Sequence, residues 1–81
     1  MTNLGNRLSD VGRAESALPV SEEAVAIYRR LADASPAHLL GLVAALRNLG
    51  IRLFQLGRQP EAVRAIEEAV RIHDLLHNQA V

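Results

Sequence analysis

Apolar residues recur at spacings of three and four along the second half of the chain, which is typical of one buried helical face. From residue 36 onward this stripe comprises Leu39, Val43, Leu46, Leu49, Leu53 and Leu56. Ser35 can cap such a helix, and Pro36 suits its first turn because the N–H that proline lacks has no partner there. Gly57 is typical of a helix end. The pattern predicts a helix over residues 36–56.

A second helix is expected from Pro60 to about Leu76, with an inward stripe of Ala62, Ile66, Ala69, Val70, His73 and Leu76. The N-terminal part repeats the plan in shorter form and predicts helices over residues 2–11 and 16–34. Capping by Ser16 would place Pro19 in a first turn, where its missing N–H is harmless; otherwise Pro19 should kink the helix. We therefore expect an all-α fold of about four helices.

The chain repeats itself at an offset of 45 residues, and thirteen of the 25 pairs from Asn3 to Ile27 are identical. A fixed period of this size indicates stacked helical units, each of which buries its apolar face against its neighbours. We predict one domain over residues 1–81, with a truncated first repeat over 2–34 and a second repeat over 36–77. Small residues leave room for close approach of the helices in each unit: Gly5, Ala17, Ala24, Gly50, Ala62 and Ala69.

Composition supports helices and removes several functions. Hydrophobic residues make up 49% of the chain and aromatic residues 2%, and nine basic residues balance nine acidic ones. This balance gives no reason to expect nucleic acid or an anionic membrane as a partner. The lack of cysteine excludes disulfides, thiol catalysis and cysteine zinc sites. No basic segment followed by an apolar run opens the chain, and no stretch approaches the roughly 18–20 apolar residues of a membrane span. We expect a soluble, cytoplasmic protein.

The order Leu4-Gly5, Leu8, Gly12, Ala17 and Ala24 returns as Leu49-Gly50, Leu53, Gly57, Ala62 and Ala69. It resembles the tetratricopeptide repeat, most closely the longer-period bacterial arrays related to the kinesin light chain type, from Thr2 to about Leu76. The sequence departs from that family in its longer period, in Leu8, Leu53, Ser21 and Ile66 at aromatic positions, and in lacking proline at Arg29 and Asp74. The resemblance implies a short right-handed superhelix of antiparallel helix-turn-helix repeats. It also implies a scaffold that binds proteins or peptides and is not an enzyme.

In that family the first helix of each unit lines the concave, partner-binding face. Here the resemblance assigns to this face Asn3, Asn6, Ala44, Arg47, Asn48, Ile51, Phe54 and Gln55, flanked by Thr2, Ser9 and Asp10. Periodicity independently places the six residues of the second unit on one helical face. Ile51 and Phe54 are apolar where the first unit has polar residues, which suggests a contact surface. The alternative is that both pack against the preceding helices.

Other candidate sites have simpler explanations. Asn6, Arg47 and Asn48 could hold a peptide carboxylate, or could be solvated. His73 and His77 stand four apart beside Asp74, but no third ligand is evident, and histidine near a helix C-terminus is favourable in itself. We therefore expect no metal and no cofactor.

Two functions remain open. The first is a module that binds a peptide or protein on its concave face. The second is a self-association element that oligomerises through exposed repeat ends, including Leu75 and Leu76, or by helix exchange. About three repeats are usually needed to bury a continuous core, and 81 residues hold fewer than two periods of 45. We therefore expect a homo-oligomer or a fragment of a longer array.

Overall fold

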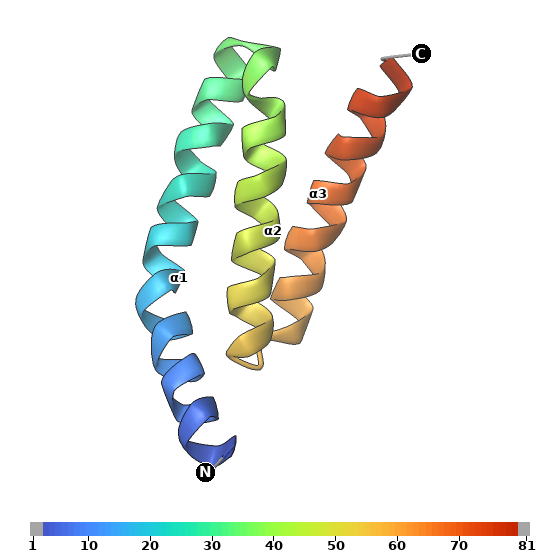
Figure 1. Ribbon diagram of the computed structural model, residues 1–81. Helices are drawn as coiled ribbons and strands as arrows, with labels where there is room; N and C mark the ends of the chain where they lie inside the picture. The colour runs from blue at the N-terminus through green and yellow to red at the C-terminus, as the bar shows by residue number, and fades with distance from the viewer. Residues whose placement is uncertain (1–2, 80–81) are drawn as a thin grey trace.

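The computed structural model describes residues 3–79, and the side chains of residues 12–78. It consists of α1 (Asn3–Ala34), a 3₁₀ turn η1 (Pro36–His38), α2 (Leu39–Gln55) and α3 (Gln59–Gln79), shown in Figure 1. Residues 3–79 contain no strand, so the predicted all-α fold is confirmed. Helix α2 lies between α1 and α3 and packs against both.

The predicted helix end near Val11 is wrong, because α1 runs without a break through Gly12. In the second unit the turn combines Gly57, at a φ of 79°, with Pro60, which cannot continue a helix. The equivalents in the first unit are Gly12, which stays helical, and Glu15, which a helix accepts. The described chain therefore has three α-helices, not four. Thr2, the predicted start of the first helix, lies outside the described residues.

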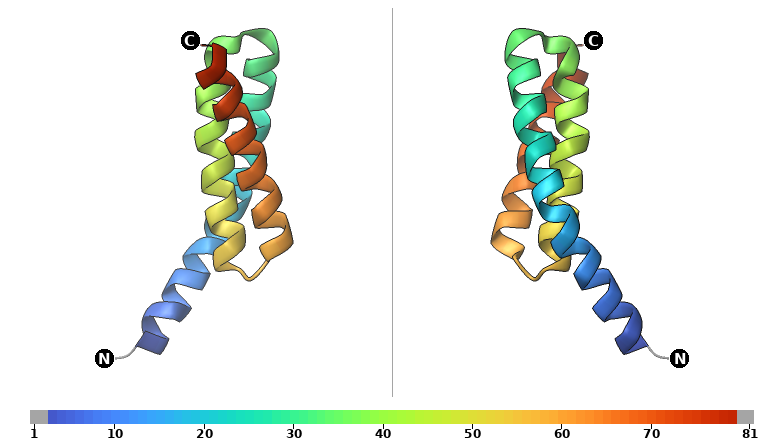
Figure 2. Two further views of the ribbon diagram at one scale, coloured as in Figure 1. Left: turned by 90° about the vertical axis from the view of Figure 1, so that its right-hand side faces the viewer. Right: turned by 90° about the vertical axis from the view of Figure 1, so that its left-hand side faces the viewer.

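Pro19 lies inside α1, so the predicted helix start capped by Ser16 is also wrong. A proline within a helix removes one backbone hydrogen bond, and its ring crowds the carbonyl four residues earlier. Such positions are a usual cause of helix bending. Figure 2 shows that the N-terminal part of α1 leans away from the line of the bundle. The kinked alternative is thus the one observed.

The boundaries of α2 follow the local signals. Ser35 has an extended backbone, and its Oγ accepts a hydrogen bond from the Ala37 N–H at 3.4 Å, which confirms it as a cap. Pro36 opens the 3₁₀ turn rather than the α-helix itself. At the other end, the Gly57 N–H donates to the Phe54 carbonyl at 3.0 Å and the Arg58 N–H donates to the Leu53 carbonyl at 2.9 Å. This pair of bonds satisfies the last carbonyls of α2 and reverses the chain, as predicted for Gly57.

The core lies on both sides of α2 and is formed mainly by aliphatic side chains. It comprises Val25, Leu42, Val43, Ala45, Leu46 and Ala69. Leu46, from the predicted stripe, is only 1% exposed. A Cβ added at Gly41 would clash with the Tyr28 ring, 2.6 Å from its Cδ1. Glycine at this position therefore lets α1 and α2 approach closely.

The predicted inward stripe of α3 is only partly correct. Ala62 and Ala69 are buried as expected, but Ile66, Val70 and His73 are exposed. Among the described helices the backbone of α3 packs along that of α2, so one narrow strip of small residues is enough to form its contact. No helix within residues 3–79 covers the wider apolar face that periodicity indicates.

Candidate groove on α2 and α3

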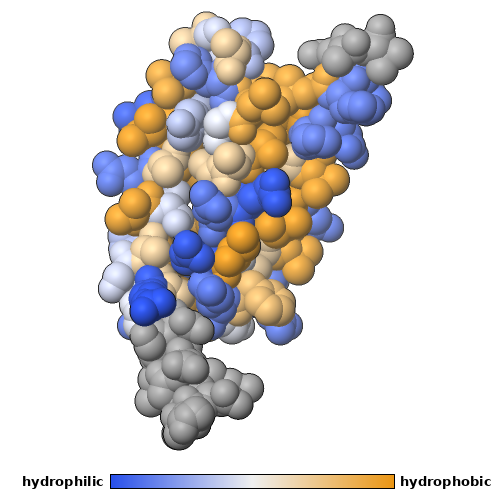
Figure 3. Space-filling view, in the orientation of Figure 1, coloured by the Kyte–Doolittle hydropathy of each residue, from blue (hydrophilic) through white to orange (hydrophobic). Residues whose placement is uncertain are grey.

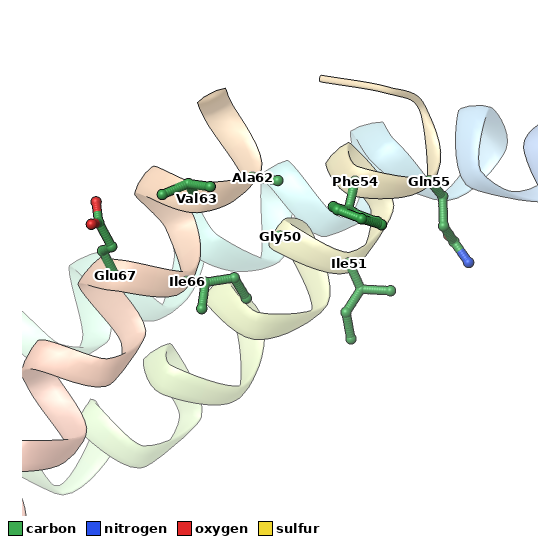
Figure 4. A pocket seen from close by; sticks show the side chains of 8 residues that line it. All are labelled: Gly50, Ile51, Phe54, Gln55, Ala62, Val63, Ile66 and Glu67. Carbon is green, nitrogen blue, oxygen red and sulfur yellow. The ribbon is translucent and has the colours of Figure 1, made fainter. Parts of the chain in front are cut away.

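A groove lies between the two helices of the second unit, next to the turn that joins them. Its cavity volume is about 350 Å³, and it is lined by Gly50, Ile51, Phe54, Gln55, Ala62, Val63, Ile66 and Glu67. We call these eight residues the α2–α3 groove. Figure 4 shows Glu67 and Gln55 at its two ends, with the apolar side chains between them.

The floor of the groove depends on the small residues that the repeat conserves in both units. A Cβ added at Gly50 would lie 2.6 Å from Cδ1 of Ile66 and 3.3 Å from the Ala62 carbonyl oxygen. Without that Cβ, Ile66 lies over the backbone of α2 (Figure 4). Gly50 and Ala62 therefore bring the two helices together, and the larger side chains rise on either side.

The walls of the groove are large apolar side chains that face solvent. Phe54 is 63% exposed and Val63 52%, while Ile51 and Ile66 are also exposed. Figure 3 shows hydrophobic side chains gathered over α2 and α3 on one face of the molecule. Single exposed apolar residues are ordinary, but four around one cavity indicate a contact surface.

The structure brings six of the predicted site residues together on α2. Ile51, Phe54 and Gln55 line the groove, while Ala44, Arg47 and Asn48 share an adjoining hollow with Ile51. Neither Ile51 nor Phe54 is buried against the preceding helices, so the packing alternative does not describe them. The other two predicted residues, Asn3 and Asn6, belong to the part of α1 whose side chains are not described.

Sequence analysis missed the contribution of α3. Val63 and Glu67 were not assigned to any site, and Ile66 was assigned to the core, yet all three line the groove. The repeat was the signal that could have found them. Helix α2 covers one face of α1, and the equivalent face of α3 can be buried only by a further helix.

The groove continues along α3 toward the C-terminus. A second hollow of about 250 Å³ is lined by Val43, Arg47, Ile66, Ala69, Val70 and His73. Beyond it, the rings of His73 and His77 stack with centroids 6.5 Å apart. His73 Nδ1 lies 3.8 Å from Oδ1 of Asp74. Within the described residues no three histidine, cysteine or acidic side chains are placed to hold a metal ion.

Two ion pairs lie near the groove, and one of them joins two helices. The Arg29 guanidinium of α1 donates two hydrogen bonds to the Glu68 carboxylate of α3, one of them at 2.9 Å, and so links the outer helices across α2. These hydrogen bonds lower the pKa of Glu68 and raise the pKa of Arg29. At the turn, Arg58 donates to Glu61 at 2.6 and 2.9 Å, which lowers the pKa of the Glu61 carboxyl.

One helical stretch of the described chain, Pro36–Gln55, could cross a membrane as judged by length and composition, which the sequence expectation overlooked. It contains Arg47 and Arg52, and its buried residues pack between α1 and α3. An apolar composition is also what the central helix of a three-helix stack requires. Packing accounts for the buried apolar residues of α2, whereas Leu40, Ile51 and Phe54 of the same helix are exposed.

An α-helical hairpin packed on the last helix of a preceding, sequence-related unit defines a helical-repeat protein. The chain belongs to the tetratricopeptide repeat family, because the family model for the tetratricopeptide repeat matches residues 1–74. No curated protein and no solved structure matches the chain. Members of this family are in general protein-interaction modules with a non-enzymatic scaffold fold. The kinesin light chain subtype stays a prediction.

Proposed function

We propose that this chain is a protein-interaction module that holds a peptide or protein segment in the α2–α3 groove and along the strip of α2 beside it. The observation that carries the proposal is the exposure of Ile51, Phe54, Val63 and Ile66 around one cavity. Membership of a family of interaction modules supports it. No catalytic role is proposed.

The chemistry of the groove indicates the kind of segment that fits. Apolar walls favour aliphatic or aromatic side chains of the partner, since burying them removes apolar surface of both chains from water. Gln55 and Glu67 at the ends, with Arg47 and Asn48 beside it, can hydrogen-bond polar groups that flank those side chains. An amphipathic helix laid into a groove combines these features.

A library of displayed peptides tests the proposal. We expect peptides with regularly spaced apolar residues to be enriched on the chain, and their binding to be lost when Ile51→Asn and Phe54→Ser are combined. Both side chains are exposed, so circular dichroism should show unchanged helicity. Val20→Asn is the matched control, because Val20 is exposed on α1 away from the groove. Peptides that bind the double variant as well as the parent chain would refute the proposal.

A second candidate function is self-association. It is favoured by the exposure of Leu40, at the start of α2, and of Leu75, in the last part of α3. Apolar surface at the end of a repeat can pack against another copy of the chain. Leu75→Glu should then convert an oligomer into monomers, as measured by light scattering after size exclusion. An oligomer unaffected by Leu75→Glu would show that the surface around Leu75 does not form the contact between copies.

A further inference from the structure

The repeat allows the covered face of one helix to be compared with the uncovered face of its equivalent. On α1, Val25 is 7% exposed and Tyr28 packs against the core, because α2 lies over them. Their equivalents at an offset of 45 are Val70, which is 53% exposed, and His73, which is also exposed. Helix α3 therefore repeats the docking face of α1, and no described residue covers it.

The half of that docking face on α1 that lies level with the α2–α3 turn is covered by the last part of α2, residues 48–55. There Leu49 packs against the core, and Leu53 is buried. The sequence carries the same covering segment a second time: residues 3–11 have Leu4, Gly5 and Leu8 where α2 has Leu49, Gly50 and Leu53. The chain thus contains a docking face on α3 that no described residue covers, and a copy of the covering sequence outside the hairpin.

Residues 3–11 of a molecule cannot cover the α2–α3 groove of the same molecule, because α1 is one continuous helix. Helix α1 lies on the opposite side of α2 from α3, and its N-terminal part leads away from the bundle past the α2–α3 turn (Figures 1 and 2). A second molecule can supply it. Helices α1 and α3 run in the same direction, so a two-fold axis perpendicular to them makes α1 of one copy antiparallel to α3 of the other. This is the direction in which α2 lies on α1.

We propose that residues 3–11 of a second copy occupy the α2–α3 groove, in a symmetrical exchange of N-terminal helical segments. The inference rests on the proposed function of the groove and names its occupant. The register is set by the repeat. Because Arg52 of α2 lines a hollow with Ala17 of α1, Arg7 of the second copy should lie beside Ala62. The exchanged segment then covers the groove near the turn and leaves the region of His73 open.

The oligomeric state of the 81-residue chain and three variants tests this exchange. We expect the parent chain to form dimers in sedimentation velocity measurements, and Val63→Glu in the groove or Leu8→Glu in the segment to yield monomers. Val20→Glu is the matched control, since Val20 is an exposed valine outside the groove, and it should remain dimeric. Circular dichroism should show that all four proteins keep their helicity.

Mixing the two monomeric variants separates exchange from other modes of association. The chain with Val63→Glu keeps an intact segment, and the chain with Leu8→Glu keeps an intact groove. We expect an equal mixture to form heterodimers with one intact contact, although neither variant dimerises alone. If mixing does not restore association, the exchange model is overturned.

Two other outcomes would also overturn the inference. One is a parent chain that stays monomeric at every concentration tested, and the other is a dimer that Leu75→Glu abolishes and Val63→Glu does not. A monomer that still captures library peptides through Ile51 and Phe54 would overturn the exchange while supporting the proposed function. The two proposals can therefore fail separately.

Discussion

Gly12 and Gly57 occupy equivalent positions in the repeat but have opposite conformations, and alanine substitution should affect them in opposite directions. Gly57 ends α2 with a φ of 79°, where an alanine Cβ crowds the following carbonyl. Gly57→Ala should therefore cost about 1–2 kcal/mol of folding free energy. Gly12 lies within α1, and an added Cβ there has no heavy atom within 4 Å. Gly12→Ala should stabilise the helix by about 0.5–1 kcal/mol, because alanine loses less backbone entropy on folding.

Urea unfolding followed by far-ultraviolet circular dichroism would measure the change in the free energy of unfolding for both variants. Thermal unfolding followed by the same signal gives the melting temperature, which 1 kcal/mol shifts by about 4–8 °C in a domain of this size. Gly12→Ala should therefore raise it by several degrees, and Gly57→Ala should lower it by more. All proteins are compared at one concentration, since association would add to the measured stability.

The result that refutes this reasoning is a loss of stability in both variants. It would mean that Gly12 also forms a turn with positive φ, so that the first unit folds as a hairpin. A gain for Gly12→Ala alone would support the continuous α1, on which the proposed exchange of N-terminal segments depends.

Four further variants test the packing, the ion pair and the groove. Leu46→Ala should lower the free energy of unfolding in urea by about 2–5 kcal/mol, because the Leu46 side chain is 1% exposed. Leu40→Ala on the same helix should lower it by less than about 0.5 kcal/mol, because Leu40 is 65% exposed. Equal losses would contradict the orientation of α2. The pKa of Glu68 is lowered by Arg29, so the pair stabilises the fold above the unfolded pKa of about 4.3, and this contribution is lost as the pH falls through the folded pKa. Glu68→Gln should remove up to about 0.5 kcal/mol at neutral pH and make the acid-side decline shallower, since both side chains are partly solvated; an unchanged pH profile would argue against the pair. Gly50→Ala should cost about 1 kcal/mol and weaken peptide capture, because its Cβ would displace Ile66 into the groove; capture at the parent level would show that Ile66 does not shape the site.

The parts of the fold that the sequence predicted well are those set by local chemistry. Ser35 caps the start of the hairpin, Gly57 reverses the chain, and the leucine stripe of α2 is buried or partly buried. Each depends on a few adjacent residues whose preferences are strong. That six of the predicted residues share one strip of α2 could be predicted for the same reason, since it follows from helical periodicity within one element.

The continuity of α1 could not be predicted from the repeat, because an internal alignment transfers a turn from one unit to the other without weighing what causes it. Gly57 reverses the chain together with Pro60, whereas Gly12 precedes Glu15 and has no such support. Glycine permits a turn but does not force one. Pro19, the residue that most strongly opposes a helix in this region, bends α1 instead of ending it.

Burial on α3 depends on neighbours, which no single helix specifies. The same apolar pattern is present in both units, yet Val25 is 7% exposed and its equivalent Val70 is 53% exposed. The difference is the presence of α2 over one valine and the absence of any described helix over the other. Fully burying a valine side chain contributes about 1.5 kcal/mol or more. A helix placed on α3 as α2 is placed on α1 would thus gain from Val63 and Ile66, which line the groove, and from Val70 beyond it.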